Sequence, residues 1–495
     1  MDFISGEERE QVLLLPERIE DYVNDDNPVR VIDAYINGLD LIEIGFKNAE
    51  LNSTGRPPYD PADLLKLYVY GYMNRIRSSR RLEKETKRNL EVIWLLSMLA
   101  PDHKTIARFR HENGEALKKV FRNFVRLCVE MGLYGRELAA IDGSKFKAVN
   151  SRKRNFTKEQ IEKKVREISV KIEEYLKEME KNDAEEDKEK VTEKRAEEIK
   201  VIVEDLRKRK ERYEGYQKEL EEKGETQKSL TDGDSRLMTT NSAKMDVCYN
   251  VQTAVDAKNK LIVDFEVSNQ GNDKNFITPM AGRAQQVLGT ETLTVVTDAG
   301  YESIQDILAA MNQGIEVHVA GTDFDVCVPA KEGEGKEICS HHEGRCVYIA
   351  DRNIALCPMG KVLYPRSCKK GKGGHVGVYC NREACRQCTC ICTENACGVF
   401  EYQVPMEEND FTKTYNDQNL EVKQIRIKPD KALVKQRKSI VEHPFGTIKR
   451  AMDAGYCLTK GIKNVAGEFS LTFLAYNLKR VINILGSRKL IEKMG

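Results

Sequence analysis

Between residues 136 and 320 the sequence predicts three strands followed by alternating helices and strands. The first strand pattern is "RELAAIDGSKFKAV", and two further β-rich runs, joined by "DAKNK", follow in "DVCYNVQTAVDAKNKLIVDFEVSN". The later patterns are a helix in "KNFITPMAGRAQQVL", a strand in "TLTVVTDAGY", a helix in "SIQDILAAMNQ" and a strand in "IEVHVA". This order predicts an α/β domain with a mixed sheet.

A long charged segment interrupts this domain after its first strand. Residues 151–230 hold 23 basic and 23 acidic residues and almost no Gly or Pro. Apolar residues recur at spacings of four and three, as in Ile161, Val165, Ile168, Ile172, Tyr175 and Met179. The pattern predicts a coiled-coil-like antiparallel helical hairpin with the polar tip "KNDAEEDKEK". It is interpreted as a dimerisation or DNA-clamping arm, and the alternative is a solvated insertion.

The net charge of +1 hides two basic stretches. Arg56–Arg126 holds 16 basic against 8 acidic residues, and Lys431–Gly495 holds 13 against 4. Both carry apolar residues at helical spacing, so basic helices that bind a polyanion such as nucleic acid are expected, with a solvated face as the alternative. No run of about 18 apolar residues is present. The acidic N-terminus has no signal-peptide layout, which predicts a cytosolic protein.

Two acids follow apolar strand patterns and precede small residues. Asp298 ends "TVVTD" before Ala299 and Gly300, and Asp142 precedes Gly143 in "LAAIDGSK". Open α/β sheets bind ligands beyond the carboxyl ends of their strands, so the two carboxylates are expected side by side. Oxygen ligands suit hard divalent cations, and two ions roughly 4 Å apart support phosphoryl transfer. The alternative is that each Asp is a turn or capping residue.

A third acid, Glu442, lies in the basic segment "KQRKSIVEHPFGTIKR". The basic residues around it are Arg437, Lys438, Lys449 and Arg450. Lys449 is seven residues further on, two helical turns along and on nearly the same face. Pro444 predicts a helix start or a kink at that point. Glu442 is interpreted as a metal ligand near DNA phosphate, and the alternative is an ion pair.

Ten of the 14 cysteines fall between Cys339 and Cys397, which in a reducing compartment indicates metal binding rather than disulfides. Cys385 and Cys388 have zinc-knuckle spacing, and Cys392 follows. Cys357 is the first choice and Cys380 the second for the fourth ligand. A structural zinc would fold an insert of low apolar content. Unpaired structural thiols are the alternative, and a second zinc at Cys339, His341, His342 and Cys346 is left open.

The N-terminal basic stretch predicts a helical DNA-binding unit. Asp102 is expected to cap a short basic helix in "PDHKTIARFR". The residues expected to contact phosphates are Arg75, Arg77, Arg80 and Arg81.

The chain resembles DDE-type bacterial insertion-sequence transposases of the branch with a cysteine-rich insert. The resemblance covers nearly the whole chain. It is carried by "GRPPYDPADLLKLYVYGYMNRIRSSRRLEKETKRN", "PDHKTIARFRHEN", "AIDGSKFKA", "CYNVQTAVD", "VVTDAGY", "RKSIVEHPFGTIKR" and "LAYNLKR".

The resemblance implies an RNase H-like catalytic core with Asp142, Asp298 and Glu442 as the metal-binding triad. It implies Mg²⁺- or Mn²⁺-dependent hydrolysis at transposon ends, followed by strand transfer into target DNA by a 3′ hydroxyl. The N-terminal helices would bind the terminal inverted repeats. A homodimer is expected in the active complex, in the bacterial cytoplasm at the nucleoid and without a membrane partner.

One part of the pattern departs from related transposases, which often carry Tyr-x2-Arg-x3-Glu-x6-Lys around the glutamate. Lys449 fits the last position, but Lys435 and Lys438 occupy the Tyr and Arg positions. Arg437 is one residue off, so the residue that steers DNA near the third acid is left open.

The expected layout is a helical N-terminal DNA-binding domain, an interrupted catalytic core with two insertions, and C-terminal core helices carrying the third acid. The ranges are 1–135 (DNA-binding), 136–155 (first core strand), 156–230 (hairpin insertion), 231–325 (core continued), 326–425 (Cys-rich zinc-binding insertion) and 426–495 (C-terminal core helices). Two alternatives to a transposase remain open: a domesticated DNA-binding protein without catalysis, and a metal-dependent nuclease.

Overall fold

The computed structural model describes most of the chain. The described residues are 18–50, 57–184, 189–240, 244–330, 344–371, 374–386, 388, 398–405, 411–412 and 415–494. The chain forms two compact units. Unit 1 consists of Met1–Gly135, Lys258–Ile262 and Glu442–Gly495, and unit 2 consists of Arg136–Ala257 and Val263–Val441. The sequence range 426–495, predicted as one C-terminal part, therefore contributes to both units.

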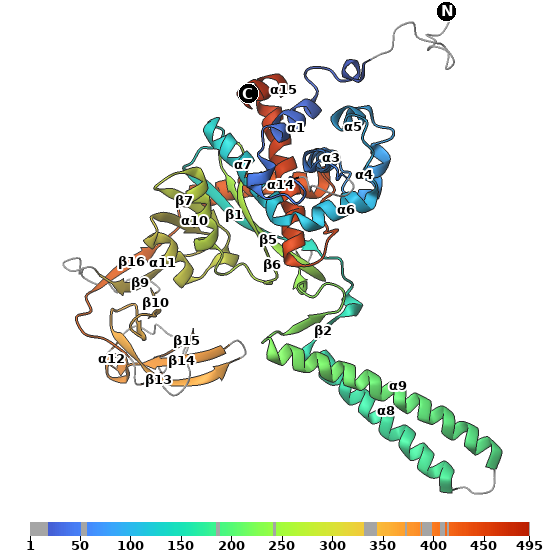
Figure 1. The fold of residues 1–495 in the computed structure, drawn as a ribbon. Coiled ribbons are helices and arrows are strands. Elements are labelled where there is room, and N and C mark those ends of the chain that lie inside the picture. Colours follow the sequence, from blue (N-terminus) through green and yellow to red (C-terminus); the bar gives the residue numbers. More distant parts are fainter. Residues whose placement is uncertain are drawn as a thin grey trace, which may run out of the picture. The chain divides into compact units, whose positions relative to one another are not determined.

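Unit 1 is helical (Figure 1). Its elements are η1 (Ile19–Tyr22), α1 (Pro28–Asn37), α2 (Leu41–Ile44), α3 (Pro61–Met73), α4 (Ser79–Glu85), α5 (Leu90–Leu95), α6 (His103–Glu112), α7 (Gly114–Glu130), a π-helical turn (Thr447–Ala451), α14 (Ile462–Leu485) and α15 (Ser487–Met494). The long helix α14 packs against α3 and α7, and its residues from Phe469 to Leu478 are all buried. A helix buried on every side belongs to a domain interior, so α14 is the centre of unit 1.

The packing of α14 on α7 depends on two glycines. A Cβ atom at Gly467 would lie 2.9 Å from the Cα atom of Gly114, which is closer than real side chains come. Any larger residue at Gly467 would therefore push the two helices apart.

Several helices of unit 1 begin with a short polar side chain that satisfies the first free backbone N–H groups. Asn27 caps α1, Asp60 caps α3 and Asp102 caps α6. The carboxylate of Asp102 accepts hydrogen bonds from the backbone N–H groups of Lys104 at 2.8 Å and Thr105 at 2.9 Å. The predicted cap at Asp102 is confirmed.

Unit 2 contains a six-stranded mixed sheet. Its strands are β1 (Leu138–Lys147), β4 (Arg236–Thr239), β5 (Met245–Asp256), β6 (Ile262–Ser268), β7 (Leu293–Thr297) and β8 (Ile315–Val319). The order is β4-β5-β1-β7-β8, and β6 also pairs with β5. Strand β1 is antiparallel to β5 and parallel to β7, and β7 is parallel to β8. The predicted mixed sheet is confirmed.

The sheet is connected by helices at the positions that the sequence indicates. Helix α10 (Ile277–Leu288) precedes β7, and α11 (Ile304–Asn312) follows the short η3 turn (Ala299–Tyr301). The two helices pack against each other. Two backbone N–H groups at the start of α10, those of Ile277 and Thr278, donate to the carboxylate of Asp306 on α11 at 2.8 and 3.0 Å.

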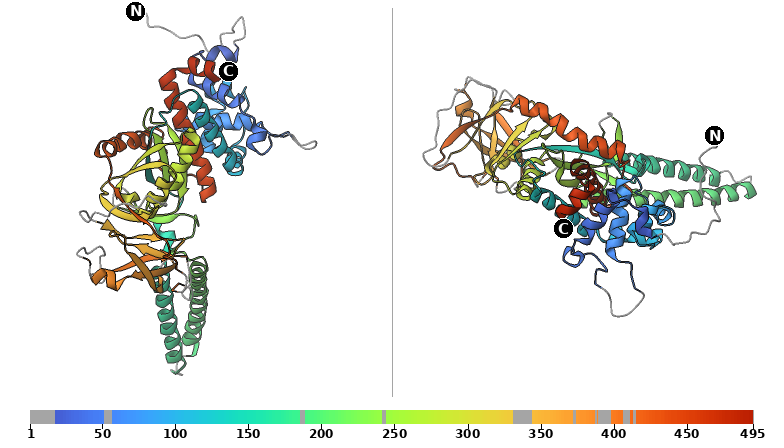
Figure 2. Two further views of the ribbon diagram at one scale, coloured as in Figure 1. Left: turned by 90° about the vertical axis from the view of Figure 1, so that its left-hand side faces the viewer. Right: turned by 90° about the horizontal axis from the view of Figure 1, so that it is seen from above.

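A helical hairpin leaves the sheet after β1. It consists of α8 (Lys158–Ala184) and α9 (Glu189–Glu222), which lie side by side in every view (Figures 1 and 2). Before and after it come η2 (Arg152–Arg154), β2 (Asn155–Thr157) and β3 (Gln227–Ser229), with β2 and β3 paired antiparallel. An ion pair of 2.9 Å joins Arg195 of α9 to Glu178 of α8. This geometry agrees with the hairpin that the apolar spacing indicates.

The cysteine-rich region is a β-rich insert with two sheets. The strands are β9 (Phe324–Pro329), β10 (Gly344–Arg345), β11 (Val347–Ile349), β12 (Ile354–Leu356), β13 (Val362–Gly371), β14 (Gly374–Cys380), β15 (Val399–Val404) and β16 (Val422–Ile427). The sheet orders are β10-β9-β16 and β11-β12-β13-β14-β15, and α12 (Arg382–Arg386) follows β14.

The five-stranded sheet carries its own apolar core, built around Tyr348, Tyr379 and Phe411. Asn353 ties this core together, because it accepts from the Tyr379 hydroxyl and donates to the Phe411 carbonyl, both at 2.8 Å. The expectation that the insert has too little apolar content to fold without metal therefore overlooked this core.

Helix α13 (Lys431–Gly446) passes through Pro444, where the sequence predicted a helix start or a kink. A proline removes the hydrogen bond to the carbonyl four residues earlier, here Ile440, but the helix continues for two residues before the π-helical turn begins. Among the described residues, none of the helices is both long enough and apolar enough to cross a membrane.

Candidate active site

Asp142 and Asp298 lie on neighbouring parallel strands of unit 2. The last residues that pair β1 with β7 are Ala140 and Val296. Asp142 comes two residues after Ala140, and Asp298 comes two residues after Val296. Asp298 follows the end of β7, as predicted. Asp142 is inside β1, which continues to Lys147 through its pairing with β5, so the predicted strand end at Asp142 is wrong. What ends at Ala140 is the pairing with β7.

A guanidinium bridges the two carboxylates. Arg437 on α13 places its Nη1 atom 3.5 Å from Oδ1 of Asp142 and 3.9 Å from Oδ2 of Asp298. The side chains of Asp142 and Arg437 are 20% exposed, while that of Asp298 is 39% exposed. A single positive charge thus stands between two converging negative charges at the edge of the sheet.

The environment of Asp142 disfavours its negative charge. The pKa of Asp142 is raised to about 7. Burial is the largest cause, the charges of Asp298 and Asp273 add to it, and Arg437 acts in the opposite direction. Nearby like charges and desolvation both favour the protonated carboxyl. A cation at this position would relieve the repulsion, and carboxylate oxygens are the donors that hard divalent metals prefer.

A third carboxylate of unit 2, Asp273, was missed by the sequence analysis. It lies in the loop "NQGNDK" between β6 and α10, where Asn, Gly and Asp indicate a turn and nothing more. Its Oδ1 atom accepts from Lys145 Nζ at 3.1 Å, from Asn250 Nδ2 at 2.7 Å and from Gln252 Nε2 at 2.7 Å. The side chain is 21% exposed.

Glu442, the third predicted acid, is exposed and lies on α13 five residues after Arg437. It belongs to unit 1, whereas Asp142 and Asp298 belong to unit 2. Within the described ranges there is no group of three or more His, Cys, Asp or Glu side chains that could hold a metal ion. The structure therefore brings together two of the three predicted acids.

The predicted phosphate-contacting arginines of the N-terminal helices differ in exposure. Arg75, Arg80 and Arg81 are exposed. Arg77 is 5% exposed, and its Nη1 atom donates to the Tyr456 carbonyl at 2.9 Å and to Glu468 at 3.2 Å. The Arg77 guanidinium also stacks over the Tyr456 ring at 4.5 Å. This burial corrects the expectation for Arg77, which holds the interior of unit 1 together and offers no surface to a phosphate.

The basic residues near Glu442 also differ in how far they are exposed. Lys438 and Arg450 are exposed, and Lys449 is half-buried in the π-helical turn. Arg437 contacts both carboxylates of the Asp142–Asp298 pair in unit 2.

Four of the predicted zinc ligands are described, and Cys392 lies outside the described residues. Burial raises the pKa of Cys385, and the neighbouring thiols of Cys357, Cys388 and Cys380 raise it further. Both choices for the fourth ligand, Cys357 and Cys380, therefore interact electrostatically with Cys385, but the described cysteines form no group that could hold a metal ion. Of the second cysteine–histidine group, Cys346 alone is described, and it lies in the core of the insert.

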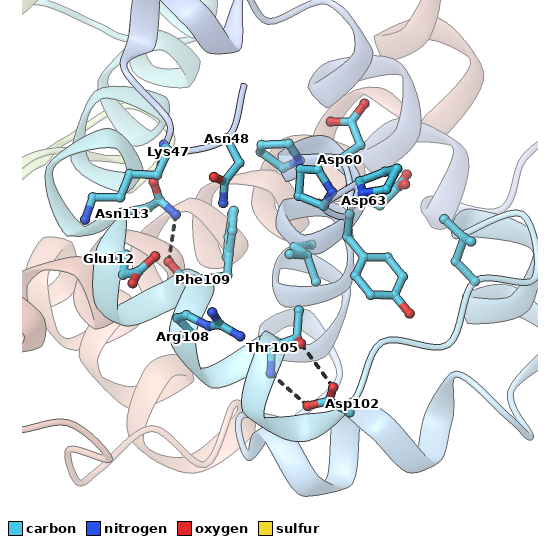
Figure 3. A pocket seen from close by; sticks show the side chains of 16 residues that line it. Lys47, Asn48, Asp60, Asp63, Asp102, Thr105, Arg108, Phe109, Glu112 and Asn113 are labelled. Atoms are coloured by element: carbon cyan, nitrogen blue, oxygen red, sulfur yellow. Dashed lines mark hydrogen bonds between the residues drawn. The ribbon is translucent and has the colours of Figure 1, made fainter. Parts of the chain in front are cut away.

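Unit 1 has a cleft of about 890 Å³ between the start of α3 and helix α6 (Figure 3). Its lining includes the acids Asp60, Asp63, Asp102 and Glu112, together with the basic Lys47 and Arg108. Asp60 and Asp102 are occupied as helix caps, and burial raises the pKa of Asp63. The acidic lining does not suit a phosphate backbone, so this cleft is distinct from the predicted DNA surface.

Two family models match the chain. Residues 17–112 match a transposase domain family (DUF772), and residues 356–482 match a transposase DDE domain family. The second range includes α13 with Arg437 and Glu442. No curated protein matches the chain.

One solved structure was also found, the cryo-EM structure of the piggyBac transposase synaptic complex with hairpin DNA. It is 10% identical, and the match covers 95% of this chain and 80% of that chain with a TM-score of 0.28. A TM-score this low carries no argument about the fold or the site. The two family matches do carry an argument, because both are to transposase domains. They confirm the resemblance drawn from the motifs and support placing the chain among the DDE-type insertion-sequence transposases.

Proposed function

We propose that the chain is a metal-dependent DDE transposase that cleaves DNA at transposon ends and joins the freed 3′ end to target DNA. The observation that carries this proposal is that the Arg437 guanidinium contacts both Asp142 and Asp298, each of which lies two residues beyond the last pair of parallel strands β1 and β7. Converging carboxylates at a sheet edge are the ligand type that Mg²⁺ and Mn²⁺ prefer.

The sheet supports an RNase H-like core. Strands β5, β1, β7 and β8 form one mixed sheet in which the neighbour on one side of β1 is antiparallel and that on the other side is parallel. The proposed core is interrupted by the helical hairpin after β1 and by the β-rich insert after β8. Glu442 is proposed as the third ligand on the strength of its motif and of its place inside the matched DDE domain range.

In the proposed reaction the chain's own residues hold and balance charge. Asp142, Asp298 and Glu442 would hold the metal ions, and Arg437 would exchange its carboxylate partners for a DNA phosphate. The bound metal would activate the attacking oxygen and stabilise the leaving one. The raised pKa of Asp142 fits this role, because a carboxyl that resists ionisation alone becomes a good ligand once a cation is present.

DNA is the proposed partner. The exposed Arg75, Arg80 and Arg81 are proposed to contact phosphates of the terminal inverted repeats. Lys438, Lys449 and Arg450 are proposed to contact DNA near the third acid. The hairpin of α8 and α9 is proposed as a dimerisation or DNA-clamping arm in a homodimer acting at the bacterial nucleoid in the cytoplasm.

A structural zinc in the β-rich insert is proposed at Cys385, Cys388, Cys392 and either Cys357 or Cys380. The electrostatic interaction of Cys357, Cys380 and Cys388 with Cys385 supports it. Because the five-stranded sheet has its own core, the zinc would fix the segment after β14 rather than fold the whole insert.

The experiment for the catalytic proposal removes one charged ligand at a time. Asp142→Asn, Asp298→Asn and Glu442→Gln should each abolish Mg²⁺-dependent nicking of a duplex that carries the element's ends, while DNA binding persists. The matched control is Asp264→Asn, which neutralises a buried acid of unit 2 that pairs with Arg283. Nicking at near wild-type rate in any of the three variants would remove that acid from the triad. Nicking without joining would favour a nuclease.

A further inference from the structure

A hydrogen-bonded cluster beside the proposed catalytic pair has no role in the mechanism above. Asp273 is its centre, and Lys145, Asn250 and Gln252 all donate to it. Lys145, Asn250 and Gln252 are 10%, 0% and 0% exposed, so this is a built interior arrangement and not a surface ion pair. In the β1–β5 register Lys145 lies opposite Asn250, and Gly143 lies opposite Gln252.

The cluster touches the backbone beside both catalytic aspartates. A Cβ atom at Gly143, the residue after Asp142, would lie 2.7 Å from Asp273 Oδ1 and would also collide with Gln252. A Cβ atom at Gly300, two residues after Asp298, would lie 3.7 Å from Asp273 Oδ2. Because Gly143 and Gly300 have no side chains, the Asp273 carboxylate can lie close to the backbone beside both acids.

Gln252 connects Asp273 to the loop that carries Asp298. The Gln252 amide donates to Asp273 and accepts a hydrogen bond from the Tyr301 hydroxyl. Tyr301 is fully buried at the end of the η3 turn, and Asp298 caps that turn by accepting from the Gly300 N–H at 2.9 Å. The Asp273 carboxylate can only accept, so the Gln252 amide must point its NH2 group at Asp273 and its oxygen at the Tyr301 hydroxyl. Asp273 thereby fixes Gln252 and, through Tyr301, the turn that follows β7.

One buried acceptor in the cluster points toward the same place. Asn250 Nδ2 donates to Asp273, and within the described part of the chain its Oδ1 atom is buried without a hydrogen-bond partner. This oxygen lies 3.0 Å from the position of a Cβ at Gly143. This oxygen could accept from a further donor or from a cation-bound water at the site.

We propose that Asp273 is a positioning residue for the metal site. It holds the turn capped by Asp298 through Gln252 and Tyr301, packs against Gly143 next to Asp142, and pairs with Lys145. This inference rests on the proposed function and deepens it. Without the carboxylate, the Lys145 ammonium would lose its 3.1 Å ion pair with Asp273, and its charge, three residues from Asp142 along β1, would oppose a divalent cation. The loss would therefore appear in metal affinity more than in the rate at saturating metal.

The test measures Mn²⁺ binding and metal-dependent nicking in the full-length chain. Mn²⁺ affinity is read from the electron paramagnetic resonance signal of the free ion, without DNA. Asp273→Asn should weaken Mn²⁺ binding about tenfold and raise the Mg²⁺ concentration for half-maximal nicking by a similar factor. At saturating Mg²⁺ its nicking rate should return to within a few-fold of wild type. In Lys145→Met/Asp273→Asn, which removes both charges, Mn²⁺ affinity should recover partly.

The control is Asp264→Asn, because Asp264 is another buried acid in an ion pair of unit 2, with Arg283 at 2.5 Å. It should lower the melting temperature and leave Mn²⁺ affinity unchanged. A folded Asp273→Asn protein with wild-type Mn²⁺ affinity and Mg²⁺ dependence would overturn the inference while leaving the proposed function intact. A wild-type chain that neither binds Mn²⁺ nor nicks DNA would overturn both.

Discussion

Asp142 and Asp298 each lie two residues beyond Ala140 and Val296, the last residues that pair parallel strands β1 and β7. Parallel strands lie about 4.8 Å apart, so these positions bring the two carboxylates within reach of one cation. In the structure that cation is the guanidinium of Arg437. The carboxylate pair is therefore a cation site whether or not a metal ion fills it.

Arg437 should compete with metal for the carboxylate pair. Arg437→Ala removes the positive charge between Asp142 and Asp298, so we expect Mn²⁺ affinity without DNA to rise about tenfold. Lys438→Ala is the control, because Lys438 is the exposed neighbour on the same helix, and its substitution should leave the affinity unchanged. Unchanged or weaker Mn²⁺ binding in Arg437→Ala would show that the guanidinium does not occupy the cation position.

Asp142 should make stability depend on pH. Its pKa is about 7 in the folded chain against an ordinary value of 3.8, so the folded state keeps a proton that the unfolded state loses. Stability is therefore lost as pH rises from about 4 to about 7 and stays low above that.

Asp142→Asn removes this loss, so without metal it should melt at a higher temperature than wild type at pH 8 and at nearly the same temperature at pH 4. Saturating Mg²⁺ should reduce the gap at pH 8. Differential scanning calorimetry across this range measures the gap directly, and a gap that is equal at both pH values would contradict the prediction.

The exposed and buried arginines of unit 1 should behave differently. Replacing Arg75, Arg80 and Arg81 together by Ala should weaken DNA binding and reduce its salt dependence, by about one unit of slope for each phosphate that the variant no longer neutralises. The melting temperature should change little.

Arg77→Ala should lower the melting temperature and leave DNA binding by the folded chain unchanged, because it removes the cation that pairs with the buried Glu468 carboxylate. Removing one partner of a buried pair costs about 3–5 kcal/mol. A stable Arg77→Ala chain with weakened DNA binding would contradict the assignment of Arg77 to the interior.

The cysteine-rich insert should hold about one zinc per chain, measured by elemental analysis of protein purified without chelator. Cys385→Ser should lose it, since Cys357, Cys380 and Cys388 all interact electrostatically with Cys385. Cys128→Ser, which changes a buried thiol on α7 of unit 1, should keep it. Clearly less than one zinc in the wild-type chain would leave the cysteines as structural thiols.

The residues that the sequence predicted best are those with a local signal. Asp298 follows a five-residue strand of which four residues are buried, and Asp102 precedes a helix whose first N–H groups it caps, so short stretches were sufficient for both. The extent of β1 beyond Asp142 depends on its pairing with β5, which comes about a hundred residues later in the chain, and the local pattern did not contain it.

The residues that were missed or misjudged depend on distant contacts. Asp273 gains its role from Asn250 and Gln252 on a neighbouring strand, and its own loop looks like an ordinary turn. Arg77 lies in a basic stretch and was expected at the surface, but Glu468, its partner, is 391 residues away. Neither contact could be inferred without the fold.

The most direct test of the account is nicking of a DNA duplex that carries the ends of the element encoding this chain. The reaction is run with Mg²⁺, with EDTA, and with the Asp298→Asn variant in Mg²⁺. We predict nicking at the element boundary with Mg²⁺ and none in either other reaction, with DNA binding retained by the variant. Binding without nicking in the wild-type chain would contradict the account and leave Asp298 as the cap of the turn that follows β7.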